Sequence, residues 1–207
     1  MRLELAERLR CPNPHAPTPL VVVSRRKRDR ELLEGFAGCP VCRLEARITA
    51  GHVQFEGTAS APAFAPTGAA PELERVIALL GLSEPGGAVM LTGRYAALAE
   101  PLAMLTEAAV VVMHAETGSA SDGVSAVLGA LSRVPFTDAT FRGAALDDGT
   151  PRAIVEDAVR TVAPEGRVLA SVALTMPAGL KELARDDHEW VAARVSVDPV
   201  VELRRRQ

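Results

Sequence analysis

Between residues 71 and 203, apolar positions follow two alternating spacings, one typical of helices and one typical of buried strands. Residues 71–80 carry apolar side chains every three or four positions, with acids in the first turn and Gly81 after the last, which predicts a helix. The uninterrupted apolar runs 88–91 and 109–113 predict strands covered on both faces. The same criteria predict strands at 141–146, 167–174 and 194–203, a turn at 164–166, helices at 95–105 (with a kink or restart at Pro101), 151–163 and 180–193, and either a short helix or a strand at 124–131.

This alternation of strands and helices predicts an α/β fold. Strands that are separated by helical segments of this length are joined by right-handed crossovers, and such crossovers make neighbouring strands parallel. The helices then cover both faces of the sheet. We therefore expect a mostly parallel sheet with helices on both sides in the larger, C-terminal part of the chain.

The first 57 residues show the pattern of a small β module instead. An apolar run at 20–23 precedes the cationic stretch 24–30, and residues 46–56 alternate about a turn at Gly51, as a short hairpin would. A module of fewer than about 60 residues buries too little surface to be comfortably stable alone. A bound metal ion would supply the missing folding energy.

An uncharged, proline-containing segment separates the two parts. Residues 57–71 hold three prolines and show no apolar periodicity, so we expect residues 58–71 to be a semi-rigid linker between a module at 1–57 and a domain at 72–207. The formal charge is +3 over residues 1–57 and −6 over residues 58–207. A basic module therefore precedes an acidic domain.

Four residues of the N-terminal module have the chemistry of a structural zinc site. Cys39 and Cys42 form a Cys-x-x-Cys turn, and Cys11 with His15 forms a looser second pair. Four such donors complete a tetrahedron and leave no open position for water, so the expected role is structural. His52 could replace His15 as the fourth ligand. A redox pair at Cys39 and Cys42, or a ribbon that has lost its ion, are the alternatives.

The cationic stretch includes Arg25, Arg26, Lys27 and Arg28, and it allows two interpretations. A solvated hairpin is the simpler one. The functional one is a contact with RNA phosphates or with an acidic protein face. Phe36 is the nearest aromatic residue, and neither Tyr nor Trp is close, so sequence-specific base recognition is not indicated.

The composition limits the expected cellular location of the protein and the classes of partner that it could bind. No apolar run approaches the roughly 20 residues that span a bilayer, so no membrane partner is expected. The first eight residues are rich in charge and lack the apolar stretch of a secretory signal. We therefore expect a cytoplasmic protein. Aromatic residues make up only 3% of the chain, so platforms for stacking bases are few.

The N-terminal module resembles a known family. Residues 9–12 (Leu-Arg-Cys-Pro), residues 33–42 (Leu-Glu-Gly-Phe-Ala-Gly-Cys-Pro-Val-Cys) and a β segment ending at Gly57 are similar to the small zinc-ribbon family that activates tRNA and protein methyltransferases. Relatives of that ribbon also occur fused to methyltransferases. The resemblance implies a zinc-ribbon-like β module ahead of the larger domain.

The C-terminal part resembles class I S-adenosylmethionine-dependent methyltransferases. Residues 134–142 (Val-Pro-Phe-Thr-Asp-Ala-Thr-Phe-Arg) look like the segment that runs into the family's fourth strand, and residues 158–169 are similar to its helix, turn and fifth strand. Residues 85–93 stand in the place of its first strand and cofactor loop. The resemblance implies a reduced Rossmann-like domain that would take S-adenosylmethionine as cofactor.

The cofactor loop departs from that family's pattern. Residues 90–95 (Met-Leu-Thr-Gly-Arg-Tyr) contain no acid and one glycine, where the family has an acid and several glycines. Gly93 and Glu116 are the remaining candidates for contact with the cofactor, although His114 lies nearer the expected position of the ribose ligand. Losing these features together predicts a degenerate pocket.

Two function classes follow from these observations. The first is a non-catalytic binding or scaffold subunit, with a protein partner or a second copy of the chain as ligand. The second is an active S-adenosylmethionine-dependent methyltransferase that acts on RNA or on a small molecule. Acidic clusters at 147–148 and 186–188 could serve acid–base chemistry or hold a divalent cation, but solvated loops or a helix face are the expected setting.

Overall fold

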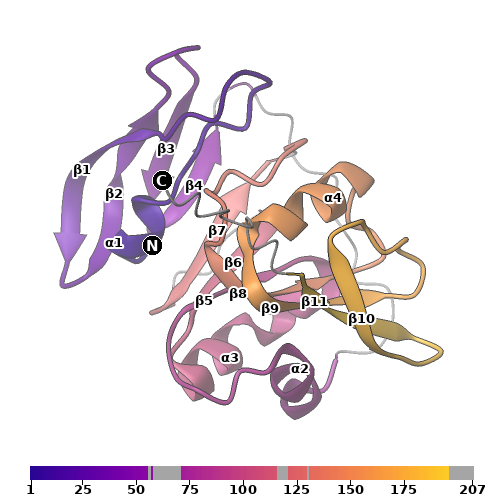
Figure 1. Ribbon diagram of the computed structural model, residues 1–207. Helices are drawn as coiled ribbons and strands as arrows, with labels where there is room; N and C mark the ends of the chain where they lie inside the picture. The colour runs from indigo at the N-terminus through magenta and orange to yellow at the C-terminus, as the bar shows by residue number, and fades with distance from the viewer. Residues whose placement is uncertain (56, 58–70, 116–120, 130, 196–207) are drawn as a thin grey trace, which may run out of the picture.

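The computed structural model describes residues 1–55, 57, 71–115, 121–129 and 131–195. Its elements form an N-terminal group of strands, which is followed by a body of alternating helices and strands (Figure 1). They are α1 (Leu3–Ala6), β1 (Val21–Arg28), β2 (Glu31–Gly38), β3 (Glu45–Thr49), β4 (His52–Phe55), α2 (Leu73–Leu80), β5 (Ala88–Leu91), the 3-10 helix η1 (Gly93–Leu98), α3 (Ala99–Thr106), β6 (Ala109–Ala115), β7 (Val124–Leu128), β8 (Phe141–Leu146), α4 (Arg152–Thr161), β9 (Val162–Ser171), β10 (Leu180–Arg185) and β11 (Glu189–Arg194). None of the helices within these ranges is long and apolar enough to cross a bilayer.

All described strands belong to one sheet, in the order β1-β2-β3-β4-β7-β6-β5-β8-β9-β11-β10. From β7 to β9 the neighbouring strands are parallel, and β11 pairs with β9 in the antiparallel sense. Counted from β5 along the chain, the parallel strands stand in the order 3-2-1-4-5, which is the doubly wound arrangement. The strand order reverses between β5 and β8. The expected α/β fold with a mostly parallel central sheet is confirmed.

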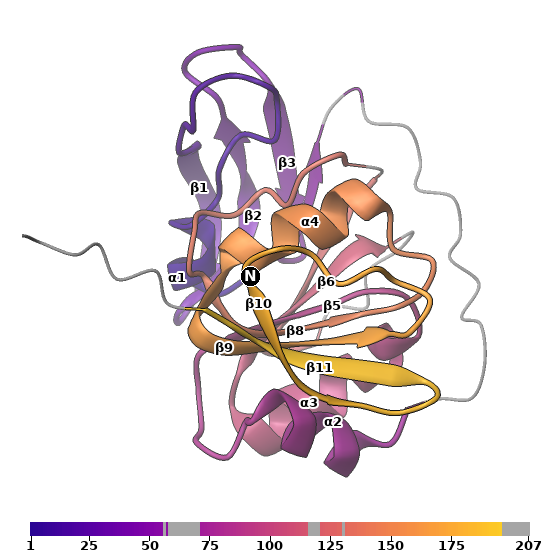
Figure 2. The ribbon, with the colours of Figure 1, turned by 45° about the vertical axis from the view of Figure 1, so that its right-hand side comes forward.

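Helices cover both faces of this sheet, as predicted. Helices α2 and α3 lie on one face and α4 lies on the other (Figure 2). Because side chains alternate along a strand, Val89 and Leu91 of β5 pack into the core under α2 and α3, whereas Met90 packs into the core under α4. The face that α4 covers carries fewer helices than a regular doubly wound fold would place there. Only twelve residues, 129–140, connect β7 to β8, and their described part contains no helix.

The N-terminal strands extend the central sheet. Strand β4 pairs with β7 in parallel, with Val53 opposite Val127, so β1–β4 continue the sheet beyond its body. Leu9 is fully buried in the same core cluster as the apolar side chains of α4, and it bridges to Phe136. Residues 58–70 of the proposed linker lie outside the described residues, so the boundaries 1–57, 58–71 and 72–207 remain predictions.

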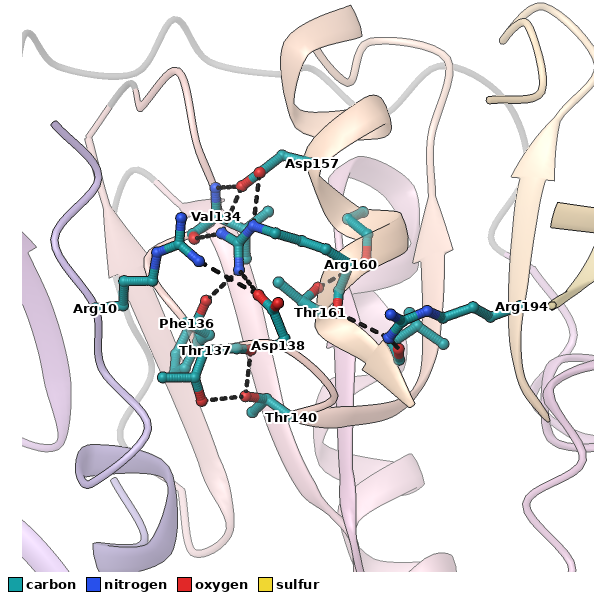
Figure 3. Close-up of polar contacts among 12 residues, drawn as sticks. Arg10, Val134, Phe136, Thr137, Asp138, Thr140, Asp157, Arg160, Thr161 and Arg194 are labelled. Atoms are coloured by element: carbon teal, nitrogen blue, oxygen red, sulfur yellow. Dashed lines mark hydrogen bonds and ion pairs between the residues drawn. The ribbon is translucent and has the colours of Figure 1, made fainter. Parts of the chain in front are cut away.

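Arg160 of α4 fastens the loop after β7 to the rest of the body (Figure 3). Its guanidinium pairs with both carboxylate oxygens of Asp157 at 2.7 Å and donates to the carbonyls of Phe136 at 2.6 Å and Val134 at 2.7 Å. Asp138 accepts hydrogen bonds from Arg160 at 3.1 Å and from Arg10 at 3.3 Å. This cluster ties the N-terminal segment to the body.

One sequence prediction is wrong: residues 180–193 form the β10–β11 hairpin and not a helix. The acidic residue Asp186 ends β10, because its carboxylate accepts hydrogen bonds at 2.8 Å from the backbone N–H groups of His188 and Glu189. Trp190 then buries its ring against β9 and donates its indole N–H to the carbonyl of Leu174 at 2.9 Å. Tertiary burial of β11 therefore outweighs the local helical spacing.

Other expectations are confirmed or refined. Residues 124–128 form a strand, and the hairpin about Gly51 is β3–β4. Pro101 stands in the first turn of α3, where the chain restarts after η1. The predicted turn at 164–166 is an irregularity inside β9, because Val162 stands opposite Phe141 and Arg167 opposite Gly143. Most of the strand expected at 194–203 lies outside the described residues.

Candidate functional site

The structure brings the four predicted zinc ligands together. Cys39 and Cys42 lie on the turn between β2 and β3, and Cys11 and His15 lie on the segment between α1 and β1. Their ligand atoms are all within 4.8 Å of one another. The Cys11 and Cys42 sulfurs are 3.5 Å apart, and His15 Nε2 lies 3.1 Å from the sulfur of Cys11 and 3.4 Å from that of Cys39.

These separations bracket those of a tetrahedral zinc site. Zinc–sulfur bonds of about 2.3 Å and zinc–nitrogen bonds of about 2.0 Å place the donors of a tetrahedron roughly 3.5–3.8 Å apart. The donor set is three thiols and one imidazole, which is the soft set that zinc prefers. Four protein donors leave no open coordination position, so the cluster has the chemistry of a structural centre and not of a catalytic one.

Neighbouring groups orient the ligands. His15 Nδ1 donates to the carbonyl of Ala16 at 2.7 Å, which leaves the Nε2 lone pair directed at the sulfurs. The amide of Asn13 donates to the Cys42 sulfur at 3.3 Å, and the backbone N–H of Cys11 donates to the Thr18 carbonyl at 2.9 Å. Sequence reasoning missed Asn13 and Thr18, because neither residue type signals a role around a metal.

The thiols differ in their electrostatics. Burial raises the pKa of the Cys11 thiol to about 12, whereas the hydrogen bond from the backbone of Leu44 lowers the pKa of the Cys42 thiol to about 6. Cys42 is therefore a thiolate at neutral pH even without an ion. The Cys11 thiol needs the charge of a bound cation to deprotonate at neutral pH, as a zinc ion would supply.

His52, the alternative fourth ligand, does not join this cluster. It stands at the start of β4, where it is buried, and its Nδ1 accepts a hydrogen bond at 3.0 Å from the backbone N–H of Ala126 in β7. Burial, together with the N-terminal ammonium, lowers the pKa of His52. His52 therefore links β4 to β7 as a neutral imidazole.

The cationic stretch forms much of the edge strand β1. Arg25 lies 4.6 Å from the centre of the Phe36 ring, and Arg26 pairs with Glu34 at 2.7 Å. Arg28 pairs with Asp122 of the body at 2.7 Å. Because β1 stands at the end of the sheet, no described strand pairs with its outer edge. The edge is therefore cationic and open.

The second candidate site lies at the carboxyl ends of β5 and β8, where the strand order reverses and where ligands bind in doubly wound sheets. Here Gly93 adopts a left-handed backbone with φ +52°. A Cβ added at Gly93 would stand 2.3 Å from a carboxylate oxygen of Asp147. Asp147, which is 3% exposed, accepts the backbone N–H of Arg94 at 2.9 Å. The chain's own carboxylate therefore fills the space over this glycine.

A hydrogen-bonded network continues from this point across the strand ends. The hydroxyl of Thr92 lies 2.6 Å from that of Thr150 and accepts the backbone N–H of Asp147 at 2.8 Å. Arg94 reaches Asp147 at 3.4 Å and Glu189 of β11 at 3.3 Å. The Tyr95 hydroxyl donates to Glu189 at 2.5 Å, and burial and this carboxylate raise the pKa of Tyr95.

The other predicted site residues are placed as follows. Glu116 lies outside the described residues, and Gly93 lies beside Asp147 as described above. Asp186 forms the β10–β11 turn and pairs with Arg75 at 2.6 Å. Sequence reasoning did not find Glu189, because it expected this residue within a helix and not on a strand beside Arg94.

No protein-family model matches the sequence, and no curated protein matches it. A Methanococcus maripaludis protein described as an S-adenosyl-L-methionine-dependent methyltransferase is similar in structure, with 11% identity and a TM-score of 0.47 over 62% of this chain and 85% of that chain. A chain of the complex between the Haloferax volcanii Trm112 methyltransferase activator and a methyltransferase shows 13% identity and a TM-score of 0.45 over 60% of this chain and 90% of that chain.

A third similar structure is a Galdieria sulphuraria protein described as a sarcosine dimethylglycine methyltransferase. It shows 13% identity and a TM-score of 0.39 over 48% of this chain, and the matched part spans 44% of that protein. All three TM-scores are below 0.5, so the fold assignment rests on the strand order and not on these similarities.

Proposed function

We propose that this protein is a non-catalytic binding or scaffold subunit. In this proposal a zinc-ribbon-like module at residues 1–57 is fused to a reduced, methyltransferase-like domain at residues 72–207, which no longer binds its ancestral cofactor. Cys11, His15, Cys39 and Cys42 would hold a structural zinc ion that stabilises the module. Zinc-bound thiolates suit a reducing compartment, which fits the expected cytoplasmic location.

The observation that carries the proposal is the contact between Asp147 and Gly93. A glycine in a cofactor loop serves a ligand when its bare backbone lets that ligand approach. At Gly93 the approaching group is a carboxylate of the same chain, held by the Arg94 N–H at 2.9 Å. A cofactor would have to displace Asp147 and leave the Arg94 guanidinium without that partner. The cost of this displacement would weaken cofactor binding, and it therefore supports the proposal that the crevice is closed to the cofactor.

The edge strand β1 supports a protein as the partner. Val21 and Val23 are exposed apolar side chains of this strand, at 58% and 57%, beside the cations. An acidic extended segment could add a strand there, with backbone hydrogen bonds for affinity and charge complementarity for specificity. Among the described contacts, Arg25 stacks on Phe36, and Arg26 and Arg28 pair with carboxylates of the chain that an acidic segment could replace at small cost.

Calorimetric titration of the full chain with S-adenosylmethionine tests the proposal. We expect no saturable heat up to about millimolar cofactor, for the parent and for Glu116→Ala alike. Saturable binding in the micromolar range that Glu116→Ala weakens would instead establish the alternative, an active methyltransferase that acts on RNA or a small molecule and holds its cofactor through Gly93 and Glu116. Asp187→Ala, which removes an acidic side chain from the exposed hairpin turn, is the matched control and should bind the cofactor as the parent does.

The partner class is tested separately by the salt dependence of binding. RNA held by the cations of β1 would bind with an affinity that falls steeply as salt rises, and the triple change of Arg25, Arg26 and Arg28 to Gln would reduce that slope. We expect little RNA binding in about 150 mM salt. Tight binding that loses its salt dependence in the triple variant would replace the protein partner by RNA.

A further inference from the structure

A cavity of about 850 Å³ opens at the amino ends of the parallel strands, at the end of the sheet opposite to the crevice over Gly93. Its floor includes the first residues of two parallel strands, Ala88 of β5 and Ala109 of β6, and Gly123 immediately before β7. Helix α1 and the turn between β1 and β2 form its other walls. The volume lies within the range of about 300–1,000 Å³ that is typical of small-molecule sites. Neither the proposed zinc site nor the cofactor crevice contributes to it.

Four arginines line this cavity, and they differ in their partners. Arg28 pairs with Asp122, and Arg30 pairs with Glu4, but the two carboxylates are 87% and 51% exposed. Exposed ion pairs contribute little free energy, so these guanidiniums can exchange partners at small cost.

The other two arginines have no ion pair within the described residues. No carboxylate there lies within 4.0 Å of the guanidinium of Arg2 or of Arg8. Arg2 acts on Glu4 only as a more distant charge, and its guanidinium lies over Gly123, 3.5 Å from where a Cβ would stand. Arg2 is half-buried, so its charge lies in the wall of the cavity and is only partly solvated.

The acidic residues of the lining limit the charge of a ligand. Glu31 accepts the backbone N–H of Gly123 at 3.1 Å, and Asp29 stands in the exposed turn between β1 and β2. A strongly charged polyanion would be repelled by them. Arg2 and Arg8 both line the cavity, and a phosphate group is a suitable acceptor for the planar N–H donors of a guanidinium, whereas a polar body with hydroxyl or amino donors matches the carboxylates.

We propose that this cavity, at the amino ends of β5 and β6, binds a small phosphate monoester with a polar, hydrogen-bond-donating body, through Arg2 and Arg8. Sugar phosphates and nucleoside monophosphates share this chemistry. The site is independent of the proposed loss of cofactor binding, because it uses the opposite edge of the sheet and different residues. A result on S-adenosylmethionine therefore neither supports nor removes it.

Calorimetric titration of the full chain in about 50 mM salt tests this assignment, with AMP, glucose 6-phosphate, adenosine, glucose and inorganic phosphate as probes. We expect one of the two esters to bind saturably with a stoichiometry of one, and at least tenfold more tightly than its dephosphorylated body or inorganic phosphate. The better ester distinguishes a nucleotide from a sugar phosphate as the natural class.

Variants locate the site. Arg8→Gln, which changes an exposed side chain and should therefore leave the fold unchanged, should weaken ester binding at least tenfold, and Arg2→Gln should do the same. Arg152→Gln on α4 removes an equally basic but unrelated side chain and should change the affinity less than twofold. The proposal is overturned if neither ester binds below about 1 mM, if adenosine or glucose binds as well as its ester, or if Arg8→Gln binds as tightly as the parent.

Discussion

The contact between Gly93 and Asp147 makes a quantitative prediction for Gly93→Ala. An alanine at φ +52° costs about 1 kcal/mol from the left-handed backbone alone. Its Cβ would also stand 2.3 Å from a carboxylate oxygen and 2.5 Å from the Cβ of Asp147, so Asp147 must move. Moving it breaks the 2.9 Å hydrogen bond from Arg94, which is worth about 1.5–3 kcal/mol for a charged acceptor. We therefore expect a loss of about 2.5–4 kcal/mol in the free energy of unfolding.

A matched glycine separates the two contributions. Gly86 has φ +87°, and nothing lies within 4 Å of where its Cβ would stand. Gly86→Ala should therefore cost only the backbone contribution, about 1 kcal/mol. The excess for Gly93→Ala over Gly86→Ala, about 1.5–3 kcal/mol, then measures the contact with Asp147.

Urea denaturation followed by circular dichroism gives these free energies. A double-mutant cycle with Asp147→Gly completes the test, because an alanine at 147 would leave the crowding Cβ in place. In the Asp147→Gly background, Gly93→Ala should cost about 1 kcal/mol. Equal losses for Gly93→Ala and Gly86→Ala, or additive losses in the cycle, would refute the claim that Asp147 occupies the space over Gly93.

Three further predictions concern other parts of the molecule. Protein purified without chelator should contain about one zinc ion per chain by elemental analysis, and Cys39→Ser should lose both the ion and thermal stability; metal content near zero in the parent would contradict the four-ligand site. Arg160→Met should lower the free energy of unfolding by about 3 kcal/mol, because it removes the hydrogen bonds of the guanidinium to Asp157 and to two carbonyls. Exposed Arg152→Met should change it by less than about 0.5 kcal/mol in the same urea titrations. Because burial lowers the pKa of His52 in the folded state, the unfolded chain binds the proton more readily, so the His52 contribution to stability is present above about pH 6.5 and is lost as the pH falls below it. In His52→Gln, the midpoint of urea unfolding should therefore fall less on acidification than in the parent. Identical pH profiles for the two proteins would show that His52 does not titrate on unfolding.

The elements that the sequence predicted well are those whose local pattern and burial agree. The apolar run 88–91 is buried on both faces as β5, and the helix expected at 71–80 forms α2 and ends at Gly81 in a left-handed conformation. The Cys/His cluster was predictable because the Cys-x-x-Cys spacing holds two thiols on one turn and the sequence offers Cys11 and His15 as two further soft donors. His15 could be separated from His52 only in three dimensions, where the pairing of β4 with β7 engages His52.

The errors come from contacts that are distant in the sequence. Residues 180–193 have helical spacing, yet β11 gains more by burying Trp190 against β9 than a helix would gain locally. The sequence predicted a degenerate pocket but not the contact at its centre, because that contact depends on Asp147 after one strand meeting Gly93 after another. The sequence indicated only that the loop lacked glycines and an acid.

A crystal structure of the chain grown with saturating S-adenosylmethionine would show whether the crevice over Gly93 excludes the cofactor. We expect the Asp147 carboxylate in contact with Gly93 and hydrogen-bonded to the Arg94 N–H, with no ligand density at the carboxyl ends of β5 and β8. Density for the intact sulfonium cofactor over Gly93, with Asp147 turned away, would contradict it.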